Sequence, residues 1–236
     1  MPYNRFFIST SFNDPSLTMK DEEMHHMRDV MRLHIGDTIE LINGKGQLAY
    51  ASVTKIAKKE LQLTIERVET FTKKTPFLSV ALPLLRPSHF DWAVEKLVEL
   101  GVDRLLLFPA NLSERKEISP SLLKRTDKLI ASAMKQSGRL FSPEVCTYSS
   151  LDELLKTNEG LVLWADESAT KTLLDTLIER KNREQLILLS GPEKGWSKME
   201  KKLLPKKGHP VLLSKNTLRA ETAAILMTGI AQHTVS

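Results

Sequence analysis

Cysteine and long apolar runs are both scarce in this sequence. Cys146 is the one cysteine among 236 residues, which excludes an internal disulfide bond and a metal site built from several cysteines. Runs such as LVLW at 161–164 and LILL at 186–189 are strand-sized and too short to cross a membrane. The first residues lack the basic region, apolar stretch and cleavage site of a signal peptide. We therefore expect a cytoplasmic protein that does not contact a membrane.

Metal binding and nucleophilic catalysis also lack their usual patterns. There is no HExxH spacing, and the adjacent His25 and His26 would point in different directions on a helix. Cys146 has no flanking histidine, and no G-x-S-x-G motif is present. His89 and His209 could be bases, but each lies near a proline at the edge of an element, where a surface role is commoner. We expect no metal site and find little support for a covalent intermediate.

The charge balance is moderately basic. The chain has 34 Lys and Arg against 29 Asp and Glu, a net charge of +5 and a pI near 9.2. This favours a polyanionic partner only slightly, because many small enzymes without a nucleic-acid partner have a similar balance. The hydrophobic fraction of 41% and mean hydropathy of -0.22 are typical of a soluble globular protein with a substantial core.

Residues 1–72 have the pattern of a small β-barrel or sandwich. Strand-like alternation with period two is found at 38–41, 48–53 and 61–65. Asn43-Gly44 is typical of a hairpin turn. A short helix is expected at 21–33, with one apolar side formed by Met24, Met27, Val30 and Met31.

A lysine cluster and a linker complete this N-terminal part. Lys55, Lys58 and Lys59 are expected in the turn between two strands, either simply solvated or in contact with phosphate. The segment FTKKTP at 71–76 has the composition of a linker.

From residue 77 onward the pattern alternates between strands and helices. Strands are expected at 78–82, 105–108, 161–164, 186–189 and 211–213. Helix starts are indicated by Ser88-x-x-Asp91, Ser119-Pro120, Ser150-x-x-Glu153 and Ser197-x-x-Glu200. Helix ends are indicated by Gly101 and Gly138. Further helices are expected at 171–180 and 223–230. This alternation predicts an α/β domain with a parallel sheet.

Two polar loops follow the strands at 186–189 and 211–213. In parallel sheets, ligands bind beyond the carboxyl ends of the strands, so the two loops are expected to share a pocket. The alternative is that both are ordinary strand-to-helix turns. The loop GPEKG at 191–195 matches neither a Walker phosphate loop nor a dinucleotide fingerprint.

Charged residues near these loops have both a structural and a functional interpretation. Arg219 and Glu221 could cap the following helix and pair with each other; alternatively, Arg219 could hold an anion and Glu221 accept a proton. The segment QSGR at 136–139 could be no more than a helix end with a favourably placed cation.

Several separate motifs together resemble one family. They are RFFI at 5–8, VMRL at 30–33, IGD at 35–37, EKLVELGV at 95–102, QSGR at 136–139 with Pro143, GPEKGWS at 191–197 and LRAETA at 218–223. Their order and kind are similar to those of the RsmE-type 16S rRNA (uracil-N3)-methyltransferases of the SPOUT superfamily. The resemblance extends over essentially the whole chain.

This resemblance implies a fold, a reaction and partners. It implies a PUA-like β-barrel RNA-binding domain at 1–72, followed at 73–236 by an α/β SPOUT methyltransferase domain whose parallel sheet contains a trefoil knot. It also implies S-adenosylmethionine as methyl donor and N3 of a uridine in the 16S rRNA of the small ribosomal subunit as acceptor. The protein would act as a homodimer with the site near the interface.

The charges of Arg219 and Glu221 lie beside the predicted pocket, and our hypothesis is that both are catalytic. Arg219 would stabilise the uridine anion or a flanking phosphate, and Glu221 would position it or receive the proton. The resemblance further implies which residues contact the ligands. Cofactor contacts would come from Leu163, Trp164, Ala165, Leu189, Ser190, Gly191, Pro192, Glu193, Gly195, Leu212, Leu213, Ser214, Leu218, Thr222 and Ala223. RNA contacts would come from Arg5, Arg32, Arg86, Gln136 and Arg139. Arg139 would be supplied either by the same subunit or by its partner.

The sequence departs from the family pattern at four positions. Lys194 replaces the second glycine of the GPEGG-like loop, and Ser214 and Asn216 replace the glycine and arginine usual in the next loop. Lys135 replaces the acidic residue usual before the glutamine at 136. Lys194 would add bulk and charge near a cationic cofactor, although a non-glycine is tolerated there if φ is negative.

Two other function classes remain open from the sequence. One is a catalytically weak or inactive RNA-binding or ribosome assembly factor that retains the SPOUT fold, which the substitutions at Lys194 and Asn216 would favour. The other is an α/β enzyme that acts on a small anionic metabolite and uses the glycine loop as an anion cradle.

Overall fold

The computed structural model describes residues 4–20, 24–73, 78–180 and 185–235. Its contacts divide the chain into two compact units. The first comprises residues 1–73 and 131–142, and the second comprises residues 74–130 and 143–236. Each unit has its own sheet and its own apolar core.

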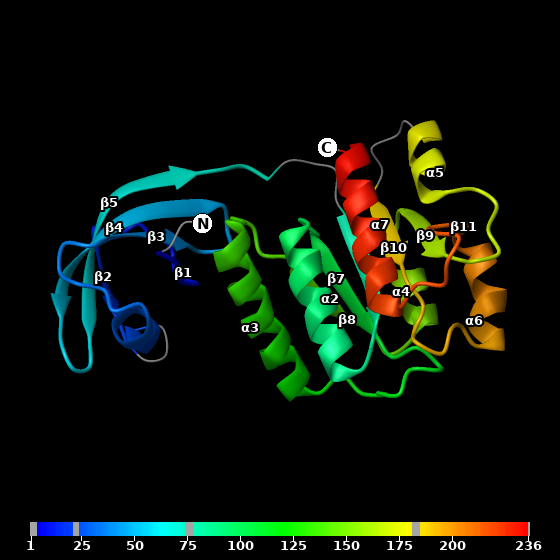
Figure 1. Ribbon diagram of the computed structural model, residues 1–236, viewed down its shortest axis with the longest axis horizontal. Helices are drawn as coiled ribbons and strands as arrows, with labels where there is room; N and C mark the ends of the chain where they lie inside the picture. Colours follow the sequence, from blue (N-terminus) through cyan, green and yellow to red (C-terminus); the bar gives the residue numbers. More distant parts are fainter. Residues whose placement is uncertain (1–3, 21–23, 74–77, 181–184, 236) are drawn as a thin grey trace. The chain divides into compact units, whose positions relative to one another are not determined.

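A five-stranded sheet forms the first unit, in the order β1-β3-β4-β5-β2 (Figure 1). β1 runs parallel to β3, and the other neighbouring strands are antiparallel. The strands are β1 (Arg5–Phe7), β2 (Ser16–Met19), β3 (Thr38–Ile42), β4 (Gln47–Ile56) and β5 (Leu61–Thr70). All three segments expected to be strands lie within β3, β4 and β5, so this prediction is confirmed.

The helix expected at 21–33 differs from the prediction. Residues 21–23 lie outside the described residues, and His26–Val30 (η1) forms a π-helical turn in which the Met31 N–H donates to the His26 carbonyl at 3.0 Å. This wider turn changes the phase of the helix. Met27 is fully buried and Met31 packs on the core, but Val30 is 66% exposed, contrary to its predicted inward position.

Residues 131–142 join the first unit through its hairpin. Gly46 N–H donates to the Leu140 carbonyl at 2.9 Å, and Ser142 N–H donates to the Gly44 carbonyl at 2.8 Å. Gly46 has φ +87°, and a Cβ there would lie 2.6 Å from the ring of Phe141. The turn predicted at Asn43-Gly44 therefore also forms hydrogen bonds with residues 140–142, a contact that the local pattern did not indicate.

The second unit is built on a six-stranded parallel sheet in the order β11-β9-β10-β6-β7-β8. Its strands are β6 (Leu78–Pro83), β7 (Arg104–Phe108), β8 (Glu144–Thr147), β9 (Leu161–Ala165), β10 (Leu186–Leu189) and β11 (His209–Val211). The predicted parallel α/β domain is confirmed.

Helices cover both faces of this sheet. They are α2 (Pro87–Glu99), α4 (Leu151–Thr157), α5 (Leu173–Glu179), α6 (Lys198–Leu203) with the 3-10 turn η2 (Leu204–Lys206), and α7 (Ala220–Val235). A further helix, α3 (Pro120–Ser137), begins in this unit, and its residues from 131 onward belong to the first unit. α4 and the α6–η2 segment pack on one face through Leu151, Leu154 and Leu204. α7 contacts α2, α5, β6 and β10, and α2 and α7 lie side by side in Figure 1. None of the helices in the described part of the chain is long and apolar enough to cross a membrane.

Local capping signals located most of these helices. The hydroxyls of Ser119, Ser150 and Ser197 accept N–H bonds from the first turns of α3, α4 and α6, as expected. Gly101 and Gly138 take φ values of +90° and +78° at helix ends, also as expected.

Several element boundaries differ from those expected, among them the start of α2, the end of β11 and the start of α7. α2 begins at Pro87 with Arg86 as its N-cap, not at Ser88, and Asp91 pairs with Arg125. β11 ends at Val211, because the Leu212 N–H donates to the Lys171 carbonyl beside α5 and the chain leaves the sheet there. α7 starts at Ala220, three residues before the apolar run that indicated it.

Candidate functional site

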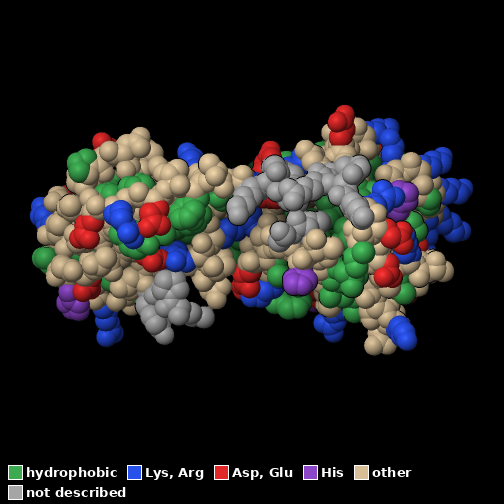
Figure 2. All heavy atoms as spheres, turned by 90° about the horizontal axis from the view of Figure 1, so that it is seen from above, with side chains coloured by type: hydrophobic (Ala, Val, Ile, Leu, Met, Phe, Trp, Pro, Cys, Tyr) green, Lys and Arg blue, Asp and Glu red, His purple; other side chains and the backbone are tan. Residues whose placement is uncertain are grey.

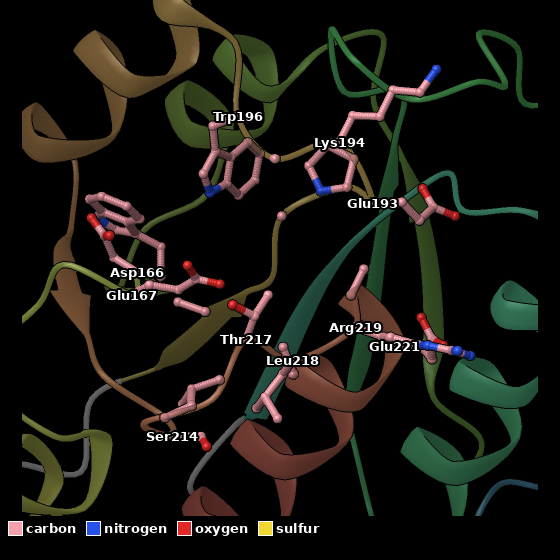
Figure 3. A pocket seen from close by; sticks show the side chains of 18 of the residues that line it. Asp166, Glu167, Glu193, Lys194, Trp196, Ser214, Thr217, Leu218, Arg219 and Glu221 are labelled. Carbon is pink, nitrogen blue, oxygen red and sulfur yellow. The ribbon is translucent and has the colours of Figure 1, made fainter.

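A cavity of about 1140 Å³ opens in the second unit, beyond the carboxyl ends of β9, β10 and β11. These three strands are neighbours in the sheet, with β9 between the other two. Their following loops supply most of the lining, together with the start of α2 and the start of α7. Figure 3 shows Asp166 and Glu167 on one side of the cavity and Glu193, Arg219 and Glu221 on the other. The two loops expected to share a pocket do so, and the loop after β9 is the third wall.

The loop after β10 is held by its glycines and by α6. Gly195 has φ +71°, and its N–H donates to the Pro192 carbonyl at 2.8 Å to close a tight turn. A Cβ on Gly191 would lie 3.2 Å from the indole of Trp196, so the small residue permits that ring to pack against the backbone. Trp196 is 8% exposed and anchors the loop in the core.

The capping box of α6 fixes the far end of this loop. The Ser197 N–H donates to Glu200 Oε2 at 2.9 Å, and the Ser197 hydroxyl accepts the Glu200 N–H at 3.3 Å. Glu200 is only 4% exposed because its Oε1 also accepts the Asn111 N–H at 2.9 Å. The loop is thereby tied to the segment that follows β7.

Lys194 does not block the cavity. Arg32 is the one non-glycine residue with positive φ among the described residues, so Lys194 has an ordinary backbone conformation. Its side chain is 63% exposed, extends away from the centre of the cavity in Figure 3, and places Nζ 3.8 Å from Glu114 Oε1. The added bulk and charge are therefore directed toward the rim.

The loop after β11 is stabilised by its own side chains. The Asn216 N–H donates to Ser214 Oγ at 3.0 Å, a short hydroxyl turn that a glycine at position 214 could not form. The Asp166 N–H donates to the Val211 carbonyl at 3.0 Å, which joins this loop to the one after β9.

A histidine and two carboxylates meet at the base of the cavity. Nδ1 of His89, in the first turn of α2, lies 3.7 Å from Oε2 of Glu221 in α7 and 4.0 Å from Oε1 of Glu193. Glu221 is only 4% exposed, whereas Arg219 is exposed at the rim. No hydrogen bond or ion pair joins Arg219 to Glu221 among the described residues. The pairing that was one alternative for these two residues is thus absent, and the imidazole of His89 faces Glu221 instead.

Several buried polar atoms of the cavity lining lack a hydrogen-bond partner. Within the described part of the chain they are Trp164 Nε1, His89 Nδ1 and Glu221 Oε2, and Ser190 Oγ, just after β10 but outside the lining, also lacks one. A buried polar atom without a hydrogen bond costs about 1–3 kcal/mol, so such atoms are rare in folded proteins. Their concentration here favours a site built to contact a polar ligand.

Arg86 links the rim to the loop after β10. Its N–H donates to Glu193 Oε1 at 2.8 Å, and its guanidinium donates to both carboxylate oxygens of Glu114, at 3.1 and 2.7 Å. These bonds hold the pKa of Glu114 below its usual range and raise that of Arg86. The Arg86–Glu114 pair is therefore fully charged at neutral pH.

Comparison with known proteins identifies the family. Residues 73–232 match the model of the RNA methyltransferase domain, and residues 20–66 match that of the RNA methyltransferase PUA domain. The ribosomal RNA small subunit methyltransferase E of Aquifex aeolicus is 30% identical over 95% of this chain and 97% of its own length. The chain belongs to this methyltransferase family. The family and enzyme class predicted from the sequence are confirmed.

Solved structures agree with this membership. A predicted RNA methyltransferase from Thermotoga maritima superposes with a TM-score of 0.78 at 31% identity, covering 98% of this chain and 97% of its own. A putative methyltransferase from Legionella pneumophila, solved with bound S-adenosylmethionine, gives a TM-score of 0.88 at 24% identity and covers 97% and 96% of the two chains. The fold of the second unit is thus that of a methyltransferase.

Most residues expected at the cofactor line the cavity of this methyltransferase. They are Trp164, Ala165, Gly191, Pro192, Glu193, Gly195, Leu212, Leu213, Ser214, Leu218 and Ala223, and the expected catalytic residues Arg219 and Glu221 line it too. Leu163 and Leu189 are fully buried in their strands, and neither Ser190 nor Thr222 is part of the lining.

The residues expected to contact RNA are dispersed. Arg86 lies at the cavity, paired with Glu114. The others belong to the first unit, where Arg5 pairs with Glu40 at 2.6 Å and approaches Gly138, close to Gln136 and Arg139. Arg32 takes a left-handed conformation, with φ 53°, just after η1.

Sequence reasoning missed several lining residues. His89, Glu114, Asp166, Glu167 and Trp196 all face the cavity. His89 was judged a surface residue because it lies near a proline. The strand order could have indicated His89. β6 pairs with β10, so the start of α2, which follows β6, lies beside the loop that follows β10.

Proposed function

We propose that this protein transfers a methyl group from S-adenosylmethionine to N3 of a uridine in the 16S rRNA of the small ribosomal subunit. The observation that carries the proposal is the cavity beyond β9, β10 and β11, with its unpaired polar atoms, inside a domain of the RNA methyltransferase family. The reaction is expected in the cytoplasm.

The cavity fits the proposed cofactor in size and charge. Ligand sites of about 300–1,000 Å³ enclose most drug-sized ligands, and this cavity of about 1140 Å³ leaves room for a target base as well. S-adenosylmethionine carries a sulfonium and an ammonium group. The carboxylates of Asp166, Glu167, Glu193 and Glu221 on the lining provide a favourable field for these cations.

The backbone of the three loops is proposed to hold the adenosine and methionine parts. The assigned residues are Leu163, Trp164 and Ala165 at the end of β9, Leu189 at the end of β10, Ser190 to Glu193 with Gly195 in the loop after β10, Leu212 to Ser214 with Leu218 after β11, and Thr222 and Ala223 in α7. The small Gly191 permits close approach of a ligand to the main chain. When bound, S-adenosylmethionine supplies the methyl group as an electrophile.

Transfer to N3 requires alignment and loss of the N3 proton. We assign to Arg219 the stabilisation of negative charge on the uracil, or of a flanking phosphate, because its side chain is exposed at the cavity rim. The N3 electron pair forms the new bond to the methyl carbon, and the methyl–sulfur bond breaks with its pair left on sulfur. Because N3 lies on the pairing edge of uracil, the base is expected to leave its stack first.

The N3 proton is assigned to the carboxylate of Glu221. Glu221 Oε2 is buried, lacks a hydrogen bond among the described residues and faces His89 Nδ1 at 3.7 Å. His89 supports this role as a positioning residue, since it can orient the carboxylate and take part of the charge. Paired groups of this kind are a recurrent means of proton transfer in enzyme sites.

The remaining parts of the proposal concern the whole chain. We propose that residues 1–72 are the PUA-like RNA-binding domain and residues 73–236 the SPOUT domain with a trefoil knot around the cofactor, of which residues 131–142 belong to the first compact unit. Arg5, Arg32, Arg86, Gln136 and Arg139 contact RNA. The protein acts as a homodimer in which Arg139 reaches the site of the partner subunit.

Methyl transfer in vitro tests the proposal. Purified protein is incubated with isotope-labelled S-adenosylmethionine and either naked 16S rRNA or small subunits that lack the modification, and the nucleosides are then separated. The expected product is labelled 3-methyluridine. Cofactor binding and RNA binding without any labelled nucleoside would instead support the inactive assembly factor and overturn the proposal.

A further inference from the structure

The net positive charge of this protein comes from one short stretch beside the cavity. Eight of the 34 Lys and Arg residues, but only one of the 29 acids, lie between positions 194 and 219. Their surplus of seven charges exceeds the net charge of +5 of the whole chain, so the remainder is slightly acidic. The one acid, Glu200, is 4% exposed and committed to the capping box.

The fold turns these lysines outward. Trp196 and Leu204 are buried in the core at either end of α6, so the opposite side of the α6–η2 segment faces solvent. That side carries five exposed lysines, which we call the α6 lysine surface: Lys198, Lys201, Lys202, Lys206 and Lys207. Figure 2 shows Lys and Arg side chains gathered at the right-hand end of the view, where α6 lies in Figure 1.

The α6 lysine surface differs from an ordinary solvated helix face. Other helices of the second unit carry lysines that are paired within the same helix, such as Lys96 with Glu99 at 2.7 Å and Lys156 with Asp152 at 2.6 Å. Within the described residues, none of the five side-chain ammonium groups of the α6 lysine surface has a hydrogen bond or an ion pair. Their mutual repulsion is uncompensated in the free protein, so a polyanion would be attracted strongly.

The surface is continuous with the mouth of the cavity. Lys201 lines the cavity, and so do Lys194 and Arg219 at the two ends of the basic stretch. A strand that delivers a nucleotide to the cavity must place the adjoining phosphates just outside it. The lysines therefore lie where these phosphates would pass.

We propose that the α6 lysine surface binds the phosphate backbone of the RNA that flanks the target nucleotide. This inference rests on the proposed function and adds to it a second RNA-binding surface, in the methyltransferase unit itself. It is distinct from the residues assigned to RNA in the first unit. Because lysines contact phosphate as point charges, the surface would contribute affinity and orientation rather than sequence specificity.

The test compares two variants with the same change of charge. The first is Lys198→Gln/Lys202→Gln/Lys206→Gln/Lys207→Gln, which spares Lys201 at the cavity. The control is Lys96→Gln/Lys124→Gln/Lys156→Gln/Lys171→Gln, which removes four exposed or part-exposed lysines from other elements of the same unit. The dissociation constant for 16S rRNA fragments that contain the target is measured from low to high salt.

The first variant should weaken RNA binding and reduce the slope of log K against log salt by about 3, because each phosphate contact contributes about 0.7 to the slope for single strands. The control should keep the slope of the unmodified protein. Affinity for S-adenosylmethionine and thermal unfolding should be unchanged in both. The double variant Lys202→Gln/Lys206→Gln, with about half the change in slope, serves if the fourfold variant folds poorly.

Two results would overturn the inference. One is an unchanged slope in the first variant, and the other is an equal loss in the control, which would reflect net charge alone. Failure of the proposed function is a separate result, because it is seen in the unmodified protein as RNA binding without methyl transfer. An unmodified protein that does not bind RNA at all would contradict both.

Discussion

Arg219 and Glu221 lie two residues apart but in different surroundings. Arg219 is exposed at the rim of the cavity, whereas Glu221 is 4% exposed and faces His89. The chain pattern placed both at a helix start, where they do lie, and left open whether they pair with each other or act separately. In the structure, Glu221 contacts His89 of α2 instead. The local pattern could not indicate this contact, because the two residues are more than 130 positions apart in the sequence.

Replacement of Arg219 tests its assigned role. Arg219→Ala should lower the rate of methyl transfer at least about 100-fold, the usual effect of removing one group that stabilises developing charge. Affinity for S-adenosylmethionine should change little, since the backbone of the loops is assigned to hold it. The matched control is Lys215→Ala, which removes an exposed cation from the same loop and should retain activity. Full activity of Arg219→Ala would remove the assignment.

The contact between His89 and Glu221 gives a second residue-scale prediction. Glu221→Gln keeps the shape of the side chain but cannot take a proton, so kcat should fall about 100-fold or more with a smaller change in KM. His89→Gln should lower kcat less, because it removes only the group that positions the carboxylate. The variant that carries both changes should have a kcat only slightly lower than that of Glu221→Gln alone, as measured by a double-mutant cycle. Strictly additive losses would show that the two residues act independently.

At the scale of elements, local signals predicted the features that are determined within one turn, but not the boundaries that depend on distant contacts. Serine caps and proline or glycine at helix termini act within one turn, so Ser119, Ser150 and Ser197 were correctly assigned. The strand predicted at 211–213 ends earlier, at Val211, because the Leu212 N–H donates to the Lys171 carbonyl, outside the strand itself. Similarly, the π-helical turn η1 changed the exposure of Val30, and an ideal helical period cannot anticipate it.

Gly208 offers a test of how β11 is held against β9. A Cβ at this position would lie 2.7 Å from the Val162 carbonyl oxygen and 2.8 Å from the Val162 Cβ, so the backbone has to shift. Gly208→Ala should destabilise the protein by about 1–3 kcal/mol. In thermal unfolding this corresponds to a loss of roughly 2–12 °C for a chain of this size. Affinity for S-adenosylmethionine should fall as well, because the loop after β11 moves with the strand.

The neighbouring exposed Lys207 provides the control for this change. Lys207→Ala should alter the free energy of unfolding by no more than about 0.5 kcal/mol, as is usual for surface substitutions. Equal stability of Gly208→Ala and Lys207→Ala would contradict the close packing of β11 on β9.

At the scale of the whole molecule, the division of the chain was only partly visible in the sequence. The change from strand-rich to alternating pattern near residue 73 is a local property of composition and could be recognised. The inclusion of residues 131–142 in the first unit depends on contacts with the hairpin at Gly44 and Gly46, which no local pattern encodes. The cavity was anticipated because parallel strands leave their carboxyl ends at one edge.

Charge is likewise a property of the whole molecule that average numbers conceal. A net charge of +5 gave little reason to expect RNA as a partner. The concentration of positive charge at 194–219, next to the cavity, is a stronger reason to expect it. The fold makes the difference, because it buries Glu200 and exposes the lysines around it.

The central claim is that this protein methylates N3 of a uridine in 16S rRNA. It is tested most directly by mass spectrometry of 16S rRNA nucleosides from cells with and without the gene, and from deleted cells that carry the unmodified gene or Arg219→Ala. We expect one 3-methyluridine to disappear on deletion, to return with the unmodified gene and to remain absent with Arg219→Ala. An unchanged amount of 3-methyluridine after deletion would contradict the claim.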